Sequence, residues 1–160
     1  MSTAYIDALK MLGRRELSEA QVRQRLAQRE HGRDEIEAAV ERLKSERAID
    51  DARVAAAMAR TESVLKRRGK LRVKRRLEGA GLAPETVRHA MEDVVGQVDD
   101  DALLEAAIAR RLRNRERAGD DHELQRLYQH LIRQGFEPEK VSRALRTRRP
   151  LRADGFDTDL

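Results

Sequence analysis

The strongest chemical feature of the sequence is a run of basic residues between positions 66 and 76. Eight of its eleven residues are basic and none is acidic. They are Lys66, Arg67, Arg68, Lys70, Arg72, Lys74, Arg75 and Arg76. Elsewhere in the chain acidic and basic residues are interleaved, so this run favours a surface that contacts phosphates or an acidic groove. The alternative interpretation is a solvated helix face without a binding role.

A second set of arginines follows later in the chain and is more diluted by acids. It consists of Arg110, Arg111, Arg113, Arg115 and Arg117, which we expect late in one helix. Because Glu116 lies among them, a solvated surface explains this set as well as binding does. We retain Arg110, Arg111 and Arg113 as further candidates for contact with an anionic partner.

Grouped aspartates raise the question of a metal site. Asp50 and Asp51 precede one alanine-rich segment, and residues 99–101 precede another. A hard cation needs several convergent oxygens, whereas an aspartate before a helix is commonly its N-cap. The four histidines are scattered and lack the spacing of a zinc pair. We therefore interpret the aspartates as helix caps and expect no metal site.

No combination of residues predicts catalysis. Ser18 belongs to a capping box with Gln21, and neither a nucleophile elbow, a Walker loop nor G-x-G-x-x-G is present. The absence of cysteine excludes disulfides and thiolate ligands. Two Tyr and two Phe are too few and too separated for a base-stacking platform. We expect no enzyme activity, no catalytic residue, no cofactor and no small-molecule substrate.

The elements that must position these residues are helices, because one sequence motif, which is typical of a helix end followed by a helix start, occurs twice. Residues 77–87 and 131–141 both read L-x-x-x-G-[LF]-x-P-E-x-V. Glycine supplies the left-handed residue that ends one helix, and proline opens the next helix in its first turn. A weaker copy begins at Leu26, where Gly32 and Arg33 replace the glycine and proline, so we expect a different turn there. A period of about fifty residues indicates a helical repeat protein.

Composition agrees with thin helical modules. Charged residues make up 39% of the 160 residues and aromatic residues only 2%, which is a poor supply for one large core. No stretch alternates with the period of a strand. We predict an all-α fold of three three-helix repeats, covering residues 1–46, 47–97 and 98–149. Residues 150–160 carry no pattern and are expected to form a disordered tail.

The overall charge indicates an anionic partner. The net charge is +5, from 34 basic and 29 acidic residues, which favours nucleic acid or a nucleoprotein surface. No apolar run approaches the length needed to span a membrane, and the first residues lack the apolar core of a signal peptide. We expect a soluble, cytoplasmic protein that has no membrane partner.

Three segments resemble, in the right order, motifs of the RecX family, the regulators of the RecA recombinase. Residues 12–26 resemble the N-terminal motif, residues 43–55 the motif with paired aspartates, and residues 67–82 the glycine-proline motif that precedes a helix. The match covers roughly residues 4–148. Lys70 stands where the family usually has proline, Arg47 where it has glycine, and Val54 where it has phenylalanine. The first two changes alter turns, and the third reduces a core residue.

The resemblance implies an elongated, curved array that binds in the helical groove of the RecA–DNA filament. Such a protein would inhibit the recombinase, ATPase and coprotease activities of RecA, and so affect DNA recombination, DNA repair and the SOS response. It would contact neighbouring RecA protomers and DNA, the latter mainly through phosphates. The resemblance implies no catalytic group.

The alternative function is a direct DNA-binding module, similar to a helix-turn-helix regulator, without a recombinase partner. A helix that reads bases needs polar or basic residues on its outer face. Residues 35–43 instead form an amphipathic helix that is acidic outside. We hypothesise that the middle repeat anchors the protein electrostatically while the outer repeats contact protein. Charge reversal at Arg72, Lys74 and Arg75 would then abolish inhibition of the filament.

Overall fold

The computed structural model describes residues 2–151, and every regular element within them is a helix. In chain order they are α1 (Thr3–Leu12), α2 (Glu19–Gln28), α3 (Arg33–Ser45), α4 (Asp51–Arg60), the π-helix η1 (Thr61–Leu65), α5 (Lys70–Gly79), α6 (Pro84–Asp93), the 3-10 helix η2 (Val95–Gln97), α7 (Asp100–Arg111), α8 (Asp121–Gln134) and α9 (Pro138–Arg146). The predicted all-α fold is confirmed. Of the predicted tail, residues 152–160 lie outside the described residues.

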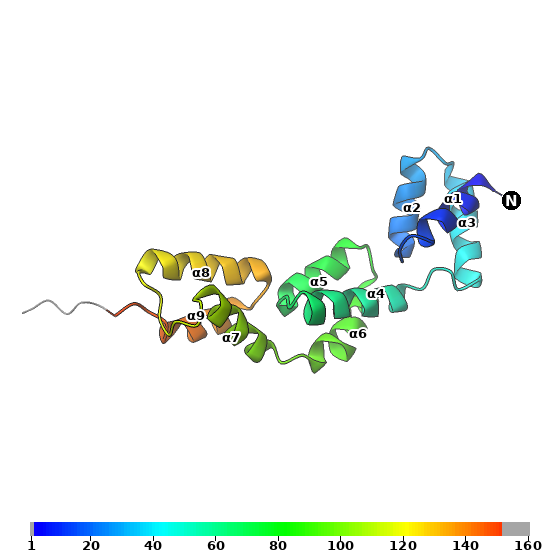
Figure 1. Cartoon of the computed structure of the whole chain (residues 1–160). Helices are drawn as coiled ribbons and strands as arrows, with labels where there is room; N and C mark the ends of the chain where they lie inside the picture. Colours follow the sequence, from blue (N-terminus) through cyan, green and yellow to red (C-terminus); the bar gives the residue numbers. More distant parts are fainter. Residues whose placement is uncertain (1, 152–160) are drawn as a thin grey trace, which may run out of the picture. The chain divides into compact units, whose positions relative to one another are not determined.

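The helices form three groups, each with its own apolar core (Figure 1). The first core lies among α1–α3, the second among α4–α6 and the third among α7–α9. The largest fully buried side chains include Leu26 and Leu43 in the first, Leu77 in the second, and Leu131 and Phe136 in the third. Three-helix repeats are therefore present, while the predicted limits 1–46, 47–97 and 98–149 stay predictions.

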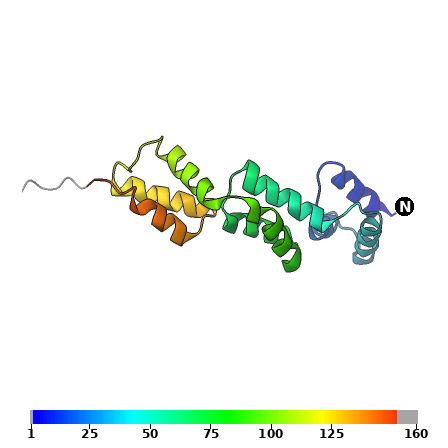
Figure 2. The same ribbon diagram turned by 90° about the horizontal axis from the view of Figure 1, so that it is seen from below.

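Contacts along the chain define two compact units. The first comprises Met1–Arg67 and Val73–Val98, and the second comprises Arg68–Arg72 and Asp99–Leu160. In the second unit, α8 packs against both α7 and α9, and the three helices lie side by side in both views (Figures 1 and 2). The short segment 68–72 thus belongs with the third group of helices, although it opens α5.

The duplicated sequence motif adopts the predicted geometry in both copies. Gly81 and Gly135 are left-handed, with φ of 72° and 94°. The helices that precede these glycines end at Gly79 and Gln134, and proline occupies the first turn of α6 and of α9. The apolar residue after each glycine, Leu82 or Phe136, is buried.

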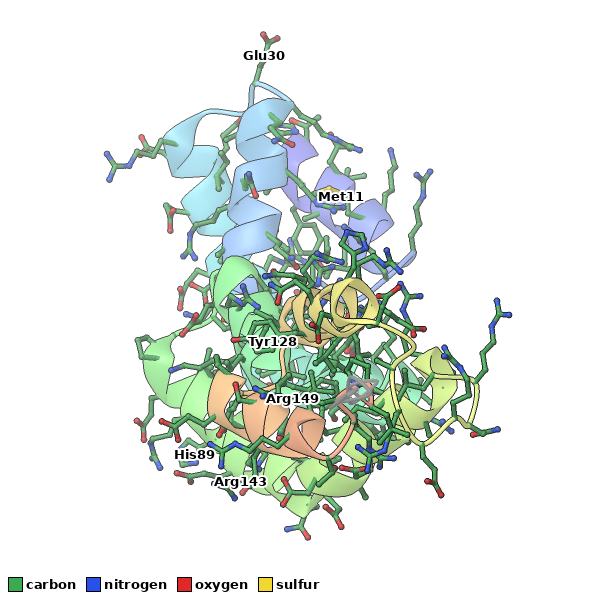
Figure 3. The ribbon with its side chains drawn as sticks, turned by 90° about the vertical axis from the view of Figure 1, so that its left-hand side faces the viewer. Met11, Glu30, His89, Tyr128, Arg143 and Arg149 are labelled. Carbon is green, nitrogen blue, oxygen red and sulfur yellow. The ribbon has the colours of Figure 1, made fainter. Side chains whose placement is uncertain are left out.

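The weaker first copy has a different turn, as expected. Its left-handed residue is Glu30, with φ of 63°, and Gly32 is the N-cap of α3. The side chain of Glu30 points away from the helices of the first group (Figure 3). An exposed glutamate can therefore replace glycine here because nothing crowds its side chain, although the left-handed conformation still carries strain.

Polar side chains cap the starts of α2, α4, α7 and α8. Ser18 forms the predicted capping box with Gln21, through a pair of 3.1 Å hydrogen bonds. Three aspartates are N-caps whose side chains accept from backbone N–H groups: Asp50 from Arg53 at 3.0 Å, Asp99 from Ala102 at 3.0 Å and Asp120 from Glu123 at 2.6 Å. No helix within residues 2–151 has the length and apolar character needed to span a membrane.

Candidate functional site

The structure divides the basic run between residues 66 and 76 into three parts. This run begins in the turn after η1, where Lys66 donates to the buried carboxylate of Glu62 at 2.7 Å and Arg67 is left-handed with φ of 53°. The run continues through residues 68–72 and ends on the outer face of α5. It therefore does not present one uniform charged surface.

Residues 68–72 pack against the carboxyl end of α8. The amide of Gly69 donates to the carbonyl of Gln134 at 2.9 Å, that of Leu71 to the carbonyl of Gly135 at 3.0 Å, and Nη1 of Arg72 to the carbonyl of Arg133 at 3.0 Å. The first amides of one helix and the last carbonyls of another have no partners within their own helices. The two helix ends therefore satisfy each other.

This packing assigns a structural role to two of the predicted contact residues. Arg68 and Arg72 are half-buried, and Nη1 of Arg68 also donates to the side-chain oxygen of Gln134. Cations at the carboxyl end of a helix are stabilising because the helix dipole is negative there. Lys70 is half-buried as well, and its charge adds to the hydrogen bond and charge of Lys140 in lowering the pKa of Asp101.

On α5 the exposed cations of the run are Lys74, Arg75 and Arg76, while Lys66 and Arg67 are exposed in the turn before it. Lys74 lies 3.9 Å from a carboxylate oxygen of Glu78, and both side chains are more than half exposed. Such a pair contributes little to stability and competes weakly with an incoming anion. The exposed cations of α5 are therefore within reach of a partner.

The second set of arginines is not one helical stripe. Arg110 and Arg111 occupy the last turn of α7, but Arg113 lies beyond the helix in a left-handed turn with φ of 51°. The expectation that Arg113, Arg115 and Arg117 continue the helix is wrong, because α7 ends at Arg111, with Leu112 as its C-cap. The side chains of Arg115 and Arg117 stabilise the following loop through Glu123 and the carbonyl of Arg149.

Sequence reasoning missed two functional candidates on α8. Arg133 and His130 lie near the segment that carries Arg68, and the positive charges of Arg111, Arg133 and Arg68 act on the His130 ring. Burial first, and then these charges, lower the pKa of His130 below its ordinary value. The only local signal was that His130 and Arg133 are three residues apart on one helix.

The grouped aspartates act as caps and ion-pair partners. Asp50 and Asp99 are N-caps, as predicted, whereas Oδ1 of Asp51 accepts from the backbone amide of Glu19 at 2.8 Å. Asp100 is buried, with Nζ of Lys140 at 3.5 Å. Within residues 2–151 no group of three or more His, Asp or Glu side chains is arranged to hold a metal ion.

Comparison with known proteins identifies the family. Models of two RecX three-helix domains match this chain, the first domain over residues 4–43 and the third over residues 99–145. The chain is 30% identical to a "Regulatory protein RecX" from Syntrophotalea carbinolica over 134 residues, covering 83% of this chain and 88% of that protein. A second "Regulatory protein RecX", from Chromohalobacter salexigens, is 30% identical over 145 residues, covering 90% and 91%. The chain belongs to the RecX family.

Solved RecX structures share this fold. The crystal structure of RecX from Lactobacillus salivarius superimposes with a TM-score of 0.68 at 19% identity, covering 91% of this chain and 94% of that one. A second structure, described as regulatory protein RecX, gives a TM-score of 0.70 at 21% identity, covering 87% and 68%. The resemblance inferred from residues 12–26, 43–55 and 67–82 is thereby confirmed at the level of the RecX family.

Proposed function

We propose that this chain binds the filament that RecA recombinase forms on DNA and inhibits its recombinase, ATPase and coprotease activities. The observation that carries the proposal is membership of the RecX family, whose curated relatives are named regulatory proteins. The exposed cations of α5 supply a surface that suits an anionic nucleoprotein. In this role the protein acts in DNA recombination, DNA repair and the SOS response.

The inhibitor acts by occupying the helical groove of the filament. Lys74, Arg75 and Arg76 contact DNA phosphates or acidic groove walls, and Arg110, Arg111 and Arg113 add to this contact. Phosphate contacts fix position without reading sequence, which suits a protein that must bind filaments on any DNA. Arg68 and Arg72 keep the third group of helices attached to the start of α5 and contribute to binding through their remaining N–H donors.

The first test is the rate of single-stranded-DNA-dependent ATP hydrolysis by RecA from the same organism, titrated with this protein. A parallel titration follows binding to the same DNA without RecA. We expect inhibition at concentrations well below those that coat the bare DNA. Unchanged hydrolysis together with tight, salt-sensitive DNA binding would instead support the alternative of a direct DNA-binding module.

The residues are tested by charge reversal on α5, with Lys74→Glu, Arg75→Glu and Arg76→Glu combined. Arg72 is left unchanged because its guanidinium donates to the carbonyl of Arg133, so its replacement would disturb the fold. A matched variant carries Arg143→Glu, Arg146→Glu and Arg149→Glu, which change the net charge equally at exposed positions. We expect the α5 variant to lose inhibition while its circular dichroism and thermal midpoint stay near wild type. Equal loss in both variants would show that net charge, not this surface, matters.

A further inference from the structure

One face of the second unit collects four basic side chains from three parts of the chain. His130 and Arg133 lie on α8, three residues apart and so on neighbouring positions of the helix surface. Arg111 comes from the last turn of α7, which packs against α8. Arg68 is tied to the same helix by its hydrogen bond to the side chain of Gln134. The fold therefore brings three arginines and one histidine together across 66 residues of sequence, from 68 to 133.

The carboxyl end of a helix normally repels anions, because its free carbonyls carry partial negative charge. Here three of those carbonyls, from Arg133, Gln134 and Gly135, already accept hydrogen bonds from residues 69–72. Residues 68–72, the docked segment, thus offset the partial negative charge at the carboxyl end of α8 and add the positive charges of Arg68 and Arg72. An anion near this end meets arginine side chains instead of unpaired carbonyls.

The charges that lower the pKa of His130 are all positive. They come from Arg111 of α7, Arg133 of α8 itself and Arg68 of the docked segment. The helix α9, which also packs against α8, contributes none of them, and no carboxylate of the described residues is among them. Burial and these cations keep the pKa of His130 below its ordinary value, so its ring is neutral at neutral pH.

We propose that Arg68, Arg111, His130 and Arg133 form a binding site for the phosphates of a nucleic-acid backbone. Guanidinium groups make short, charge-assisted hydrogen bonds to phosphate oxygens, often two at a time. None of the three arginines forms an ion pair with a carboxylate of residues 2–151, so a bound phosphate relieves the repulsion among them. This site lies outside α5, and its binding to bare nucleic acid does not depend on a recombinase.

A bound phosphate also couples this site to pH. Its negative charge offsets the arginines and raises the pKa of His130, so the complex takes up a proton. Affinity therefore rises as pH falls from the pKa of the complex towards that of the free protein. One proton gives at most about a tenfold change in affinity per pH unit within that interval. Well above the interval the histidine is neutral in both states and affinity stops changing.

The test measures binding of a fluorescently labelled thymidine oligonucleotide by anisotropy, at about pH 6 and about pH 8, to the full chain without RecA. Three variants are compared with wild type: His130→Gln, the double variant Arg111→Gln with Arg133→Gln, and a control double variant with Arg143→Gln and Arg146→Gln on α9. A nuclear magnetic resonance titration of His130, with and without the oligonucleotide, reports its pKa directly.

We expect wild type and the α9 control to bind more tightly at the lower pH, and the pKa of His130 to rise with the oligonucleotide. His130→Gln should lose the larger part of the pH dependence, and the Arg111/Arg133 variant should bind at least tenfold more weakly, about 1.4 kcal/mol. If the Arg111/Arg133 variant binds the oligonucleotide like wild type, the proposal is overturned, even if that variant no longer inhibits RecA. In that case the face contacts protein. Normal oligonucleotide results with no inhibition by the wild-type protein would overturn only the proposed function.

Discussion

Gly69 lies against the backbone of Gly135, so that a methyl group on Gly69 would overlap the carbonyl group and the following amide of that residue. Gly135 in turn has no room for a side chain, because its Cβ would overlap the backbone and Cβ of Arg72. Because the backbone at Gly69 and the backbone at Gly135 lie so close together, the amides of residues 69 and 71 can reach the last carbonyls of α8. The two glycines thus make the packing of helix ends possible.

We expect Gly69→Ala and Gly135→Ala to destabilise the chain strongly. Backbone atoms cannot move aside as a flexible side chain can, and Gly135 also has a φ of 94°, which alone costs an alanine about 1 kcal/mol. Gly79→Ala is the control, because no atom lies within 4 Å of its added methyl group. The free energy of unfolding in urea measures the effect. Wild-type stability in Gly69→Ala would show that the close contact is not maintained in solution.

The ends of the helices could be predicted from the sequence, whereas the contact between Gly69 and Gly135 could not. The sequence motif around Gly135 itself indicates a helix end, since the glycine is followed by an apolar residue and then by proline. Gly69 is marked only by the resemblance of residues 67–82 to a glycine-proline motif, because its need for glycine comes from a residue 66 positions away. Helix ends are encoded by neighbours in sequence, and close backbone approaches by neighbours in space.

The candidate site shows the same division. The sequence correctly indicated that residues 66–76 are basic, but it could not separate Arg72, which stabilises the fold, from Lys74, which is exposed. The helix was predicted to continue over Arg113, because no glycine or proline in the sequence indicates the left-handed turn there. His130 was interpreted as one of four scattered histidines, since Arg68 and Arg111, which act on it, come from other parts of the chain. Charge is a property of the sequence, while the surroundings of each charge depend on the fold.

Replacing Ser18 with alanine should cost more than removing an ordinary helix cap. The buried hydroxyl accepts from the amide of Gln21 at 3.1 Å and also donates to the carbonyl of Ala80 at 2.5 Å. Alanine removes the cap, worth about 1 kcal/mol, and leaves a buried carbonyl without that partner, which costs about 1–3 kcal/mol more. Asp99→Ala removes only a cap and is the comparison, measured by chemical denaturation. Equal losses in the two variants would mean that the bond to Ala80 contributes nothing.

Asp51→Ala should destabilise the chain although Asp50, not Asp51, caps α4. The side chain of Asp51 accepts from the amide of Glu19, which belongs to the first turn of α2, so one aspartate supports the start of another helix. We expect a loss of about 0.5–2 kcal/mol, comparable to that of Asp50→Ala. Asp34→Ala is the control, because Asp34 is exposed in the first turn of α3 and the N-cap there is Gly32. If Asp51→Ala unfolds with the same urea midpoint as Asp34→Ala, this cross-helix cap is unimportant.

Lys140→Gln should lower stability most at intermediate pH. Nζ of Lys140 lies 2.9 Å from Asp101 and 3.5 Å from the buried carboxylate of Asp100. The hydrogen bond from Lys140, and then its charge, lower the pKa of Asp101, while the bond to Asp101 raises the pKa of Lys140.

The pKa shifts of Asp101 and Lys140 make the stability of the folded chain depend on pH. The lowered pKa of Asp101 stabilises the folded chain above about pH 4 and this contribution is lost as pH falls through the folded-state value. The raised pKa of Lys140 stabilises it below about pH 10 and this contribution is lost as pH rises through the folded-state value. Thermal midpoints measured across this range should therefore separate Lys140→Gln from wild type in the middle and converge towards both ends. Lys74→Gln is the matched control, because its 3.9 Å pair with Glu78 is exposed and should change the midpoint little. A difference between Lys140→Gln and wild type that stays constant in strong acid would show that lost packing, and not the ion pair, is responsible.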